Sequence, residues 1–236
     1  MKPRVYLDLP FDEGEEIFLG DGAAHHLSRV LRLREGDALT LFNGHGGEWD
    51  AEFLGRRRVR LRAFSDIERE SPLSITLVQG VSSGERMDYA IQKAVELGVV
   101  VIQPILTRKG VVKLEGARAE ARTHHWRKVA IAACEQCGRN RVPQVQPLKD
   151  FGEYVRDVRD AAPRLLLSGQ GISIKKHEVK TAATIAAGPE AGFAPEEQEM
   201  LERAGFVKAS LGPRVLRTET AALAAIAALN ALRGDF

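Results

Sequence analysis

Short runs of apolar residues, separated by turns, predict a β-rich N-terminal region. One stretch, 22–33, instead spaces Leu27, Val30 and Leu31 as on one face of a helix. The predicted strands are 4–7, 17–19, 38–42 and 48–53, with a glycine-rich turn at 43–47. Short strands with one helix at this length are typical of a small barrel, which we expect over residues 1–70.

An arginine-rich segment, 56–62, is predicted as a further strand of this barrel. Successive side chains of a strand point to opposite faces, so Val59 and Leu61 should point into the core. The opposite face would carry Arg56, Arg58, Arg60 and Arg62. Four guanidinium groups in a row suit an RNA phosphate backbone. They equally suit a solvated face paired with nearby acids, and both interpretations stay open. The nearby acids are Glu48, Asp50 and Glu52.

After a polar linker at 66–73 the pattern changes to continuous apolar strands that alternate with helices. The predicted strands are 75–80, 99–105, 164–168, 184–188 and 206–210. The predicted helices are 88–97, closed by Gly98, and 117–137, 195–204 and 218–233. Strands that are apolar on both faces and alternate with helices predict an α/β domain with a parallel sheet over 73–236.

Three loops carry the candidate chemistry, because open α/β sheets bind ligands at the carboxyl ends of their strands. The loop 187–193 contains two glycines and a proline, which fix a sharp backbone path. The loop 211–221 carries Arg214 and Arg217 before a helix, with Thr218 as the predicted N-cap. The third loop, 133–143, brings together Arg139, Asn140 and Arg141, residue types that bind bases and phosphates.

Charge and motifs narrow the functional classes. Residues 1–72 hold 11 basic and 14 acidic residues and the remainder holds 23 and 18, so any RNA contact must be a local patch. The phosphate-loop, dinucleotide and nucleophile-elbow motifs do not occur. Cys134 and Cys137 could serve redox chemistry or half a zinc site. No second ligand pair follows, which favours ordinary packing and predicts no metal.

The hydropathy of the chain predicts no membrane association. No apolar run approaches the ~20 residues of a membrane helix. The first residues, Met1-Lys2-Pro3-Arg4-Val5-Tyr6, lack the apolar stretch of a signal peptide. We therefore expect a cytoplasmic protein.

Taken in order, the motifs resemble the 16S ribosomal RNA (uracil-1498-N3)-methyltransferase family of the SPOUT superfamily. The matching segments are 93–99 with Pro104, 135–143, 188–193 and 211–221. The chain departs from the family pattern at three positions. Ala191 replaces a glycine, Cys137 a serine, and Ala194 a serine before the helix at Pro195. Ala191 would matter if its backbone needed a positive φ or pressed against a ligand.

The resemblance implies a PUA-like RNA-binding barrel at 1–70 and a trefoil-knotted SPOUT domain at 73–236. It further implies an obligate homodimer that acts on 16S rRNA of the small ribosomal subunit, with RNA bound across both subunits. S-adenosyl-L-methionine is the implied cofactor. Its implied site consists of Ser168, Gly188, Pro189, Glu190, Gly192, Leu211, Gly212, Leu216, Arg217 and Thr220.

Methylation of uracil N3 requires removal of its proton, or donors that stabilise charge on O2 and O4. We expect Arg139 and Asn140 to hold the uracil or its phosphate, and Arg217 to stabilise the developing charge. Glu219 would either brace Arg217, the favoured role, or act as the base. The candidate RNA contacts are Arg56, Arg58, Arg60, Arg62, Arg139, Arg141 and Arg214.

Other functions remain open at the level of sequence. A SPOUT enzyme that methylates a ribose 2′-hydroxyl of rRNA or tRNA would use the same cofactor site. A non-catalytic RNA-binding assembly factor would follow if Ala191 had disabled that site. A Rossmann-type oxidoreductase lacks its glycine fingerprint.

Overall fold

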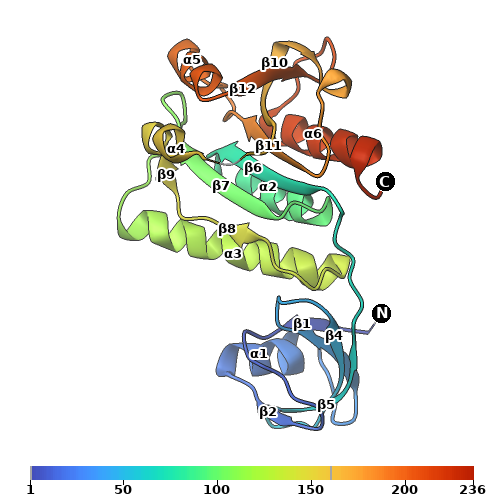
Figure 1. Cartoon of the computed structure of the whole chain (residues 1–236). Coiled ribbons are helices and arrows are strands. Elements are labelled where there is room, and N and C mark those ends of the chain that lie inside the picture. The colour runs from blue at the N-terminus through green and yellow to red at the C-terminus, as the bar shows by residue number, and fades with distance from the viewer. Residues whose placement is uncertain (1, 160) are drawn as a thin grey trace. The chain divides into compact units, whose positions relative to one another are not determined.

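The computed structural model describes residues 2–159 and 161–236, so Met1 of the predicted barrel and Asp160 lie outside it. The chain divides into two compact units (Figure 1). The first unit is Met1–Glu70 with Cys134–Val142, and the second is Ser71–Ala133 with Pro143–Phe236. The segment Cys134–Val142 belongs to the first unit, although the domain boundaries expected from the sequence, 1–70 and 73–236, placed it in the second. The reason is its hydrogen bonds to residues 4–6 and 67–70.

The first unit is a PUA-like curled sheet of five strands in the order β1-β3-β4-β5-β2. The strands are β1 (Arg4–Tyr6), β2 (Glu16–Phe18), β3 (Ala38–Phe42), β4 (Glu48–Phe53) and β5 (Arg58–Ser65). β1 pairs with β3 in parallel and the other pairs are antiparallel. Val59 and Leu61 of β5 are fully buried, as predicted, whereas β3 is buried at four consecutive positions, 39–42.

The predicted helix of this unit is real but shorter and irregular. α1 (Asp21–His25) continues as a π-helical turn, His26–Val30, in which Leu31 N donates to His26 O at 2.9 Å. Leu27 is fully buried as predicted, whereas Val30 is 59% exposed. The prediction for Val30 was wrong because a π turn inserts an extra residue and rotates the positions that follow it.

The second unit contains a seven-stranded sheet in the order β12-β10-β11-β6-β7-β8, with β9 also paired to β7. Every pairing in it is parallel, which confirms the predicted α/β class. Its strands are β6 (Ser74–Gly80), β7 (Val101–Leu106), β8 (Gln144–Val145), β9 (Lys149–Asp150), β10 (Arg164–Ser173), β11 (Ala182–Ala187) and β12 (Phe206–Ser210). The helical segments are α2 (Gly84–Glu96), α3 (Ala117–Cys137), α4 (Phe151–Asp157), the 3₁₀ turn η2 (Ile174–Lys176), α5 (Pro195–Arg203) and α6 (Thr218–Arg233). β8, β9, α4 and η2 were not anticipated, because two-residue strands and single turns carry no hydrophobic period.

Helices cover both faces of this sheet. On one face, Val78 of β6 belongs to a buried cluster that includes Tyr154 of α4 and Leu201 of α5. The neighbouring Gln79 points the other way and bonds Thr218 of α6, which also packs against α2 (Figure 1). This alternation explains why β6 is buried on both faces.

Candidate functional site

A cavity lies at the carboxyl end of β12, where a ligand was expected, and beside the part of β10 at which the regular pairing with β12 stops after Leu167. It has a volume of about 180 Å³. The lining residues are Leu167, Ser168, Gly169, Ala209, Leu211, Gly212, Pro213, Arg214, Val215, Leu216 and Ala221. Of the predicted cofactor residues, the cavity therefore brings together Ser168, Leu211, Gly212 and Leu216. Thr220 lines a neighbouring cavity with Leu211, Gly212 and Leu216.

Two backbone irregularities shape this cavity. The register of β10 against β12 shifts between Leu167 and Ile172. At Gly171 an added Cβ would lie 2.5 Å from the carbonyl oxygen of Lys208. Gly212 adopts φ +109°, and its N–H donates to Ser210 Oγ at 3.2 Å. Glycine is needed at Gly171 for close approach and at Gly212 for the left-handed turn.

The loop after β11 is tied to α6 through one carbonyl. Gly188 O accepts hydrogen bonds from Thr218 Oγ1 and from Gln79 Nε2, the latter at 3.5 Å. Gln79 Nε2 also donates to Thr218 Oγ1 at 3.0 Å. Thr218 is thus the first residue of α6, and Arg217 occupies the N-cap position without a side-chain cap. The prediction that Thr218 caps the helix was wrong, because Thr218 lies inside the helix and its hydroxyl donates to Gly188 O in the loop after β11. Gln79 was missed, although a polar residue inside an apolar strand was a signal for it.

Glu190 fixes the same loop to the start of α2. Its Oε1 accepts from Ser83 N and Ser83 Oγ, both at 2.9 Å, and from Arg86 Nη1 at 3.3 Å. Burial acts to raise the pKa of Glu190, but the hydrogen bonds from Ser83 and the charge of Arg86 outweigh it, and the net effect lowers this pKa. The loop is therefore held in one conformation by an ionised carboxylate.

The substitution at Ala191 does not strain the loop. Gly192 has φ +68°, whereas Ala191 is exposed and is not among the residues with a positive φ. The one conformation that needs glycine is thus still occupied by glycine. At Ala194 the missing serine cap is partly replaced by Glu197, whose carboxylate accepts from Ala194 N at 2.8 Å.

The residues around the cavity fit a nucleoside-type cofactor. The lining is largely apolar, with a few polar groups and exposed backbone in the loop 211–216, the composition that is usual for small-molecule sites. Outside the residues that line the cavity, the buried atoms Gln79 Oε1 and Glu219 Oε2 have no hydrogen-bond partner among the described residues. Polar atoms that are buried and unpaired call for a partner from outside the chain.

Arg217 and Glu219 lie at the beginning of α6, directly after the cavity-lining Leu216. Arg217 is exposed, and no ion pair joins it to Glu219 in the part of the chain that is described. Arg214 is also exposed, and unlike Arg217 it lines the cavity.

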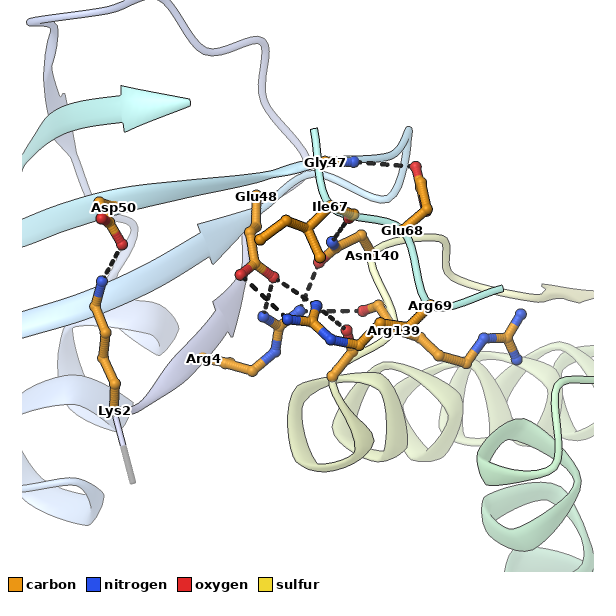
Figure 2. A network of polar contacts seen from close by, with 11 residues as sticks. Lys2, Arg4, Gly47, Glu48, Asp50, Ile67, Glu68, Arg69, Arg139 and Asn140 are labelled. Carbon is orange, nitrogen blue, oxygen red and sulfur yellow. Dashed lines mark hydrogen bonds and ion pairs between the residues drawn. The ribbon is translucent and has the colours of Figure 1, made fainter. Parts of the chain in front are cut away.

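The loop after α3 is held inside the first unit by a polar network (Figure 2). Arg139 is 3% exposed and forms a bidentate ion pair with Glu70. Asn140 is fully buried, accepting from Arg4 Nη2 at 2.6 Å and donating to Ile67 O at 2.5 Å. A contact of Arg139 or Asn140 with uracil stays a prediction that would require these bonds to be exchanged.

Glu48 is the centre of the same network. It accepts from Arg4 Nη1 and Arg69 Nη1, and the two guanidinium groups also bond the carbonyls of Arg139 and Gly138 (Figure 2). Burial acts to raise the pKa of Glu48, but the hydrogen bonds from Arg69 and Arg4 outweigh it and lower the pKa to about 2.

Arg141 is the member of this loop that faces solvent. Its side chain is 55% exposed and pairs with Glu68 at 3.1 Å, while its backbone bridges to Gly44 and His45 in the turn after β3. Of the three polar residues of the loop, Arg141 is thus the one presented to a ligand.

The arginines of β5 separate into two groups. Arg58 and Arg60 pair with Glu16 of β2, and Arg62 pairs with Glu52 of β4. Arg60 lowers the pKa of Glu16 through its hydrogen bond. Arg56 lies outside the strand in a turn with φ +43°, so the expected row of four was wrong at this position. Of the acids expected as partners, Glu48 and Asp50 instead pair with Arg4 and Lys2.

The cysteines are free thiols. Cys134 is buried and its pKa is raised to about 12 by that burial, while Cys137 is partly buried. Among the described residues no group of three or more His, Cys, Asp or Glu side chains could hold a metal ion. None of the described helices is long and apolar enough to cross a membrane.

Comparison with known proteins gives this geometry a family. A model described as the RNA methyltransferase domain matches residues 69–230, and one described as the RNA methyltransferase PUA domain matches residues 19–64. Ribosomal RNA small subunit methyltransferase E of Buchnera aphidicola is 31% identical over 99% of this chain and 95% of its own length.

Two solved structures match this chain over its full length and over their own full length. A protein of Legionella pneumophila, solved with bound SAM, is 36% identical with a TM-score of 0.95. Ribosomal RNA small subunit methyltransferase E of Neisseria gonorrhoeae, bound to S-adenosyl methionine, is 38% identical with a TM-score of 0.92. The family model spans most of the chain, and the relatives match its full length. This chain belongs to the RNA methyltransferase family that includes ribosomal RNA small subunit methyltransferase E.

Proposed function

We propose that this protein transfers the methyl group of S-adenosyl-L-methionine to N3 of a uracil in 16S rRNA, position 1498 in its family. The observation that carries the proposal is the cavity between β10 and the end of β12, which is lined by 211–216 and Ala221 of the loop 211–221, one of the segments that define the family resemblance. Relatives that match the whole chain were solved with this cofactor, which supports the assignment. Since its substrate is ribosomal RNA, we place the activity in the cytoplasm.

The residues that would hold the cofactor are those of the strand ends and loops. Leu167, Leu211 and Leu216 offer apolar surface to a flat base, and the backbone of 211–216 offers donors and acceptors. Gly188, Pro189 and Gly192 would shape the second loop, which Glu190 holds to Ser83. When bound, the cofactor supplies an activated methyl group.

The protein must then make uracil N3 nucleophilic. Arg217, exposed at the start of α6, would stabilise negative charge on the uracil oxygens as the N3 proton leaves. Glu219 Oε2 has no partner among the described residues, which supports a role as acceptor of that proton. N3 lies on the pairing edge, so the uridine must be unpaired or flipped out.

The assembly proposed from the family is a homodimer in which the C-terminal segment forms a trefoil knot. RNA would then contact both subunits, with Arg141 and Arg214 as exposed candidate contacts. Light scattering on the purified protein tests the dimer, whose mass would be twice 25.9 kDa.

The function is tested by incubating the protein with radiolabelled S-adenosyl-L-methionine and unmodified small ribosomal subunits, with naked 16S rRNA in parallel. The RNA is then digested to nucleosides. Label in 3-methyluridine is the expected result. Label in a ribose-methylated nucleoside would move the chain to the 2′-hydroxyl class. No label, together with no binding of the cofactor, would leave an RNA-binding assembly factor.

A further inference from the structure

Three arginines of the first unit adopt a backbone conformation that normally selects glycine. Arg32, Arg56 and Arg57 have φ of +56°, +43° and +72°, and among the described residues no other non-glycine residue has a positive φ. A side chain with a Cβ is disfavoured in this region, and such outliers gather at functional sites. Three arginines in that position therefore need an explanation.

At two of these positions, the backbone conformation is one that glycine would adopt with less strain than arginine. Arg32 follows the helical segment at the position where a left-handed glycine usually ends a helix, and Leu33 N donates back to Leu27 O at 2.9 Å. Arg56 lies in the β4–β5 hairpin turn, where Asn and Gly are preferred. Neither backbone conformation depends on the arginine side chain.

Arg57 differs because the chain itself uses its guanidinium group. Its Nε and Nη2 donate to Leu19 O at 3.0 and 2.9 Å, and its Nη1 pairs with Asp21 at 2.5 Å. Arg57 thus fastens the turn to the segment before α1. Within the described part of the chain, Arg32 and Arg56 make no such side-chain contact, and both are exposed.

The two turns lie side by side at one end of the β3–β4 ladder. Gly36 N donates to Phe53 O at 2.8 Å and Phe53 N to Asp37 O at 2.9 Å, so the turn before β3 flanks the turn after β4. A Cβ at Gly55 would lie 3.2 Å from the Glu35 carboxylate.

This end of the barrel carries more arginine than acid. Its arginines are Arg29, Arg32, Arg34, Arg56 and Arg57, and its acids are Asp21, Glu35, Asp37 and Glu52. Asp21 is engaged by Arg57, and Asp37 accepts from Arg34 N at 2.6 Å. On β5 itself, by contrast, Arg58 and Arg60 share the Glu16 carboxylate.

We propose that the turns containing Arg32 and Arg56 form an RNA-binding surface whose arginines contact phosphates of the RNA backbone. The inference rests on the proposed function, since it assumes an RNA substrate. Arginine suits this task because its planar guanidinium binds phosphate oxygens with two hydrogen bonds. The turn 43–47, which bridges to Arg141, lies at the opposite end of the same ladder. Five or six residues of strand span roughly 15–20 Å, so RNA in contact with both ends would be read over several nucleotides.

The test replaces both arginines by glycine in the full-length protein. Arg32→Gly/Arg56→Gly relieves the backbone while removing the two guanidinium groups, so the Tm should be unchanged or higher. Binding to transcribed, unmodified 16S rRNA should weaken several-fold. The slope of log K against log KCl concentration should fall by roughly two, about one for each phosphate contact. Affinity for S-adenosyl-L-methionine should not change.

Two comparisons make the result decisive. Arg58→Gln/Arg60→Gln removes the same charge from the strand, and a larger loss of RNA affinity there than in the glycine variant would overturn the proposal. An unchanged salt slope in a folded glycine variant would also overturn it. Loss of binding to ribosomal subunits, with intact binding to naked RNA, would overturn it as well, because that pattern identifies a protein partner.

Wild-type methyl transfer is measured separately. RNA binding that responds as expected, without any transfer, would therefore reject the proposed function and leave this surface standing.

Discussion

At the scale of single residues, the proposed chemistry depends most directly on Arg217. The side chain is exposed at the N-cap position of α6, so its removal should not disturb packing. Arg217→Ala should lower kcat by roughly 100- to 1000-fold, the usual effect of losing one group that stabilises developing charge. The Tm should be unchanged. Arg203→Ala, an exposed arginine of α5 paired with Glu199, is the control and should keep full activity. Full activity in a folded Arg217→Ala enzyme would rule out the assigned role.

Glu48 makes a second prediction, about acid stability. Its pKa is about 2 in the folded chain against 4.5 for the free side chain, because Arg69 and Arg4 donate to it. Because the pKa of Glu48 is lower in the folded than in the unfolded chain, its carboxylate stabilises the fold at pH values above the unfolded-state pKa. This stabilisation disappears as pH falls from about 5 to about 2. The shift corresponds to roughly 3 kcal/mol.

The Glu48→Gln variant isolates this contribution. Urea unfolding should show it less stable than wild type by about 3 kcal/mol near pH 6, with the difference shrinking toward zero near pH 2. Asp50→Asn, which removes an exposed carboxylate paired with Lys2, should instead follow the wild-type pH dependence. A Glu48→Gln difference that stayed constant with pH would show that the carboxylate is not held ionised.

At the scale of elements, the irregular strand β10 determines the shape of the cavity. Gly171 faces the backbone of Lys208 so closely that Gly171→Ala must push β10 away from β12. We expect a loss of stability of about 1–3 kcal/mol, as for other overpacked sites, together with weaker cofactor binding. Gly169→Ala lies two residues away on the same strand and meets no atom within 4 Å. Its Tm should match wild type, and an equal fall in Tm in both variants would contradict this account.

At the scale of the whole molecule, a dimer that binds RNA across both subunits predicts complementation. Arg217→Ala supplies an intact barrel surface, and Arg32→Gly/Arg56→Gly supplies an intact Arg217, the proposed catalytic residue. Each variant should have low activity alone at limiting RNA. When the two are co-expressed, random pairing should restore about a quarter of wild-type activity, because half of the dimers would contain one intact composite site. Activity that stays at the average of the two separate variants would mean that each subunit binds its RNA alone.

The sequence by itself determined the elements whose pattern is local and regular. β3, β4, β12, α3 and α6 have the predicted bounds, because alternation and helical spacing act over neighbouring residues. The motif 211–221 also placed a cavity correctly after the end of β12, since parallel strands bring their carboxyl ends to one edge, whereas no residue of the motif 188–193 lines that cavity.

Only the tertiary structure decided how the polar side chains are used. The sequence cannot show that Arg139 and Asn140 are bonded to Glu70 and Arg4, because those partners lie far away along the chain. Nor can alternation show that Arg56 has left its strand for a left-handed turn, since that depends on where β4 ends and the chain reverses. A side chain's type limits the partners it can accept, but the partner it obtains depends on which distant segments the fold brings beside it.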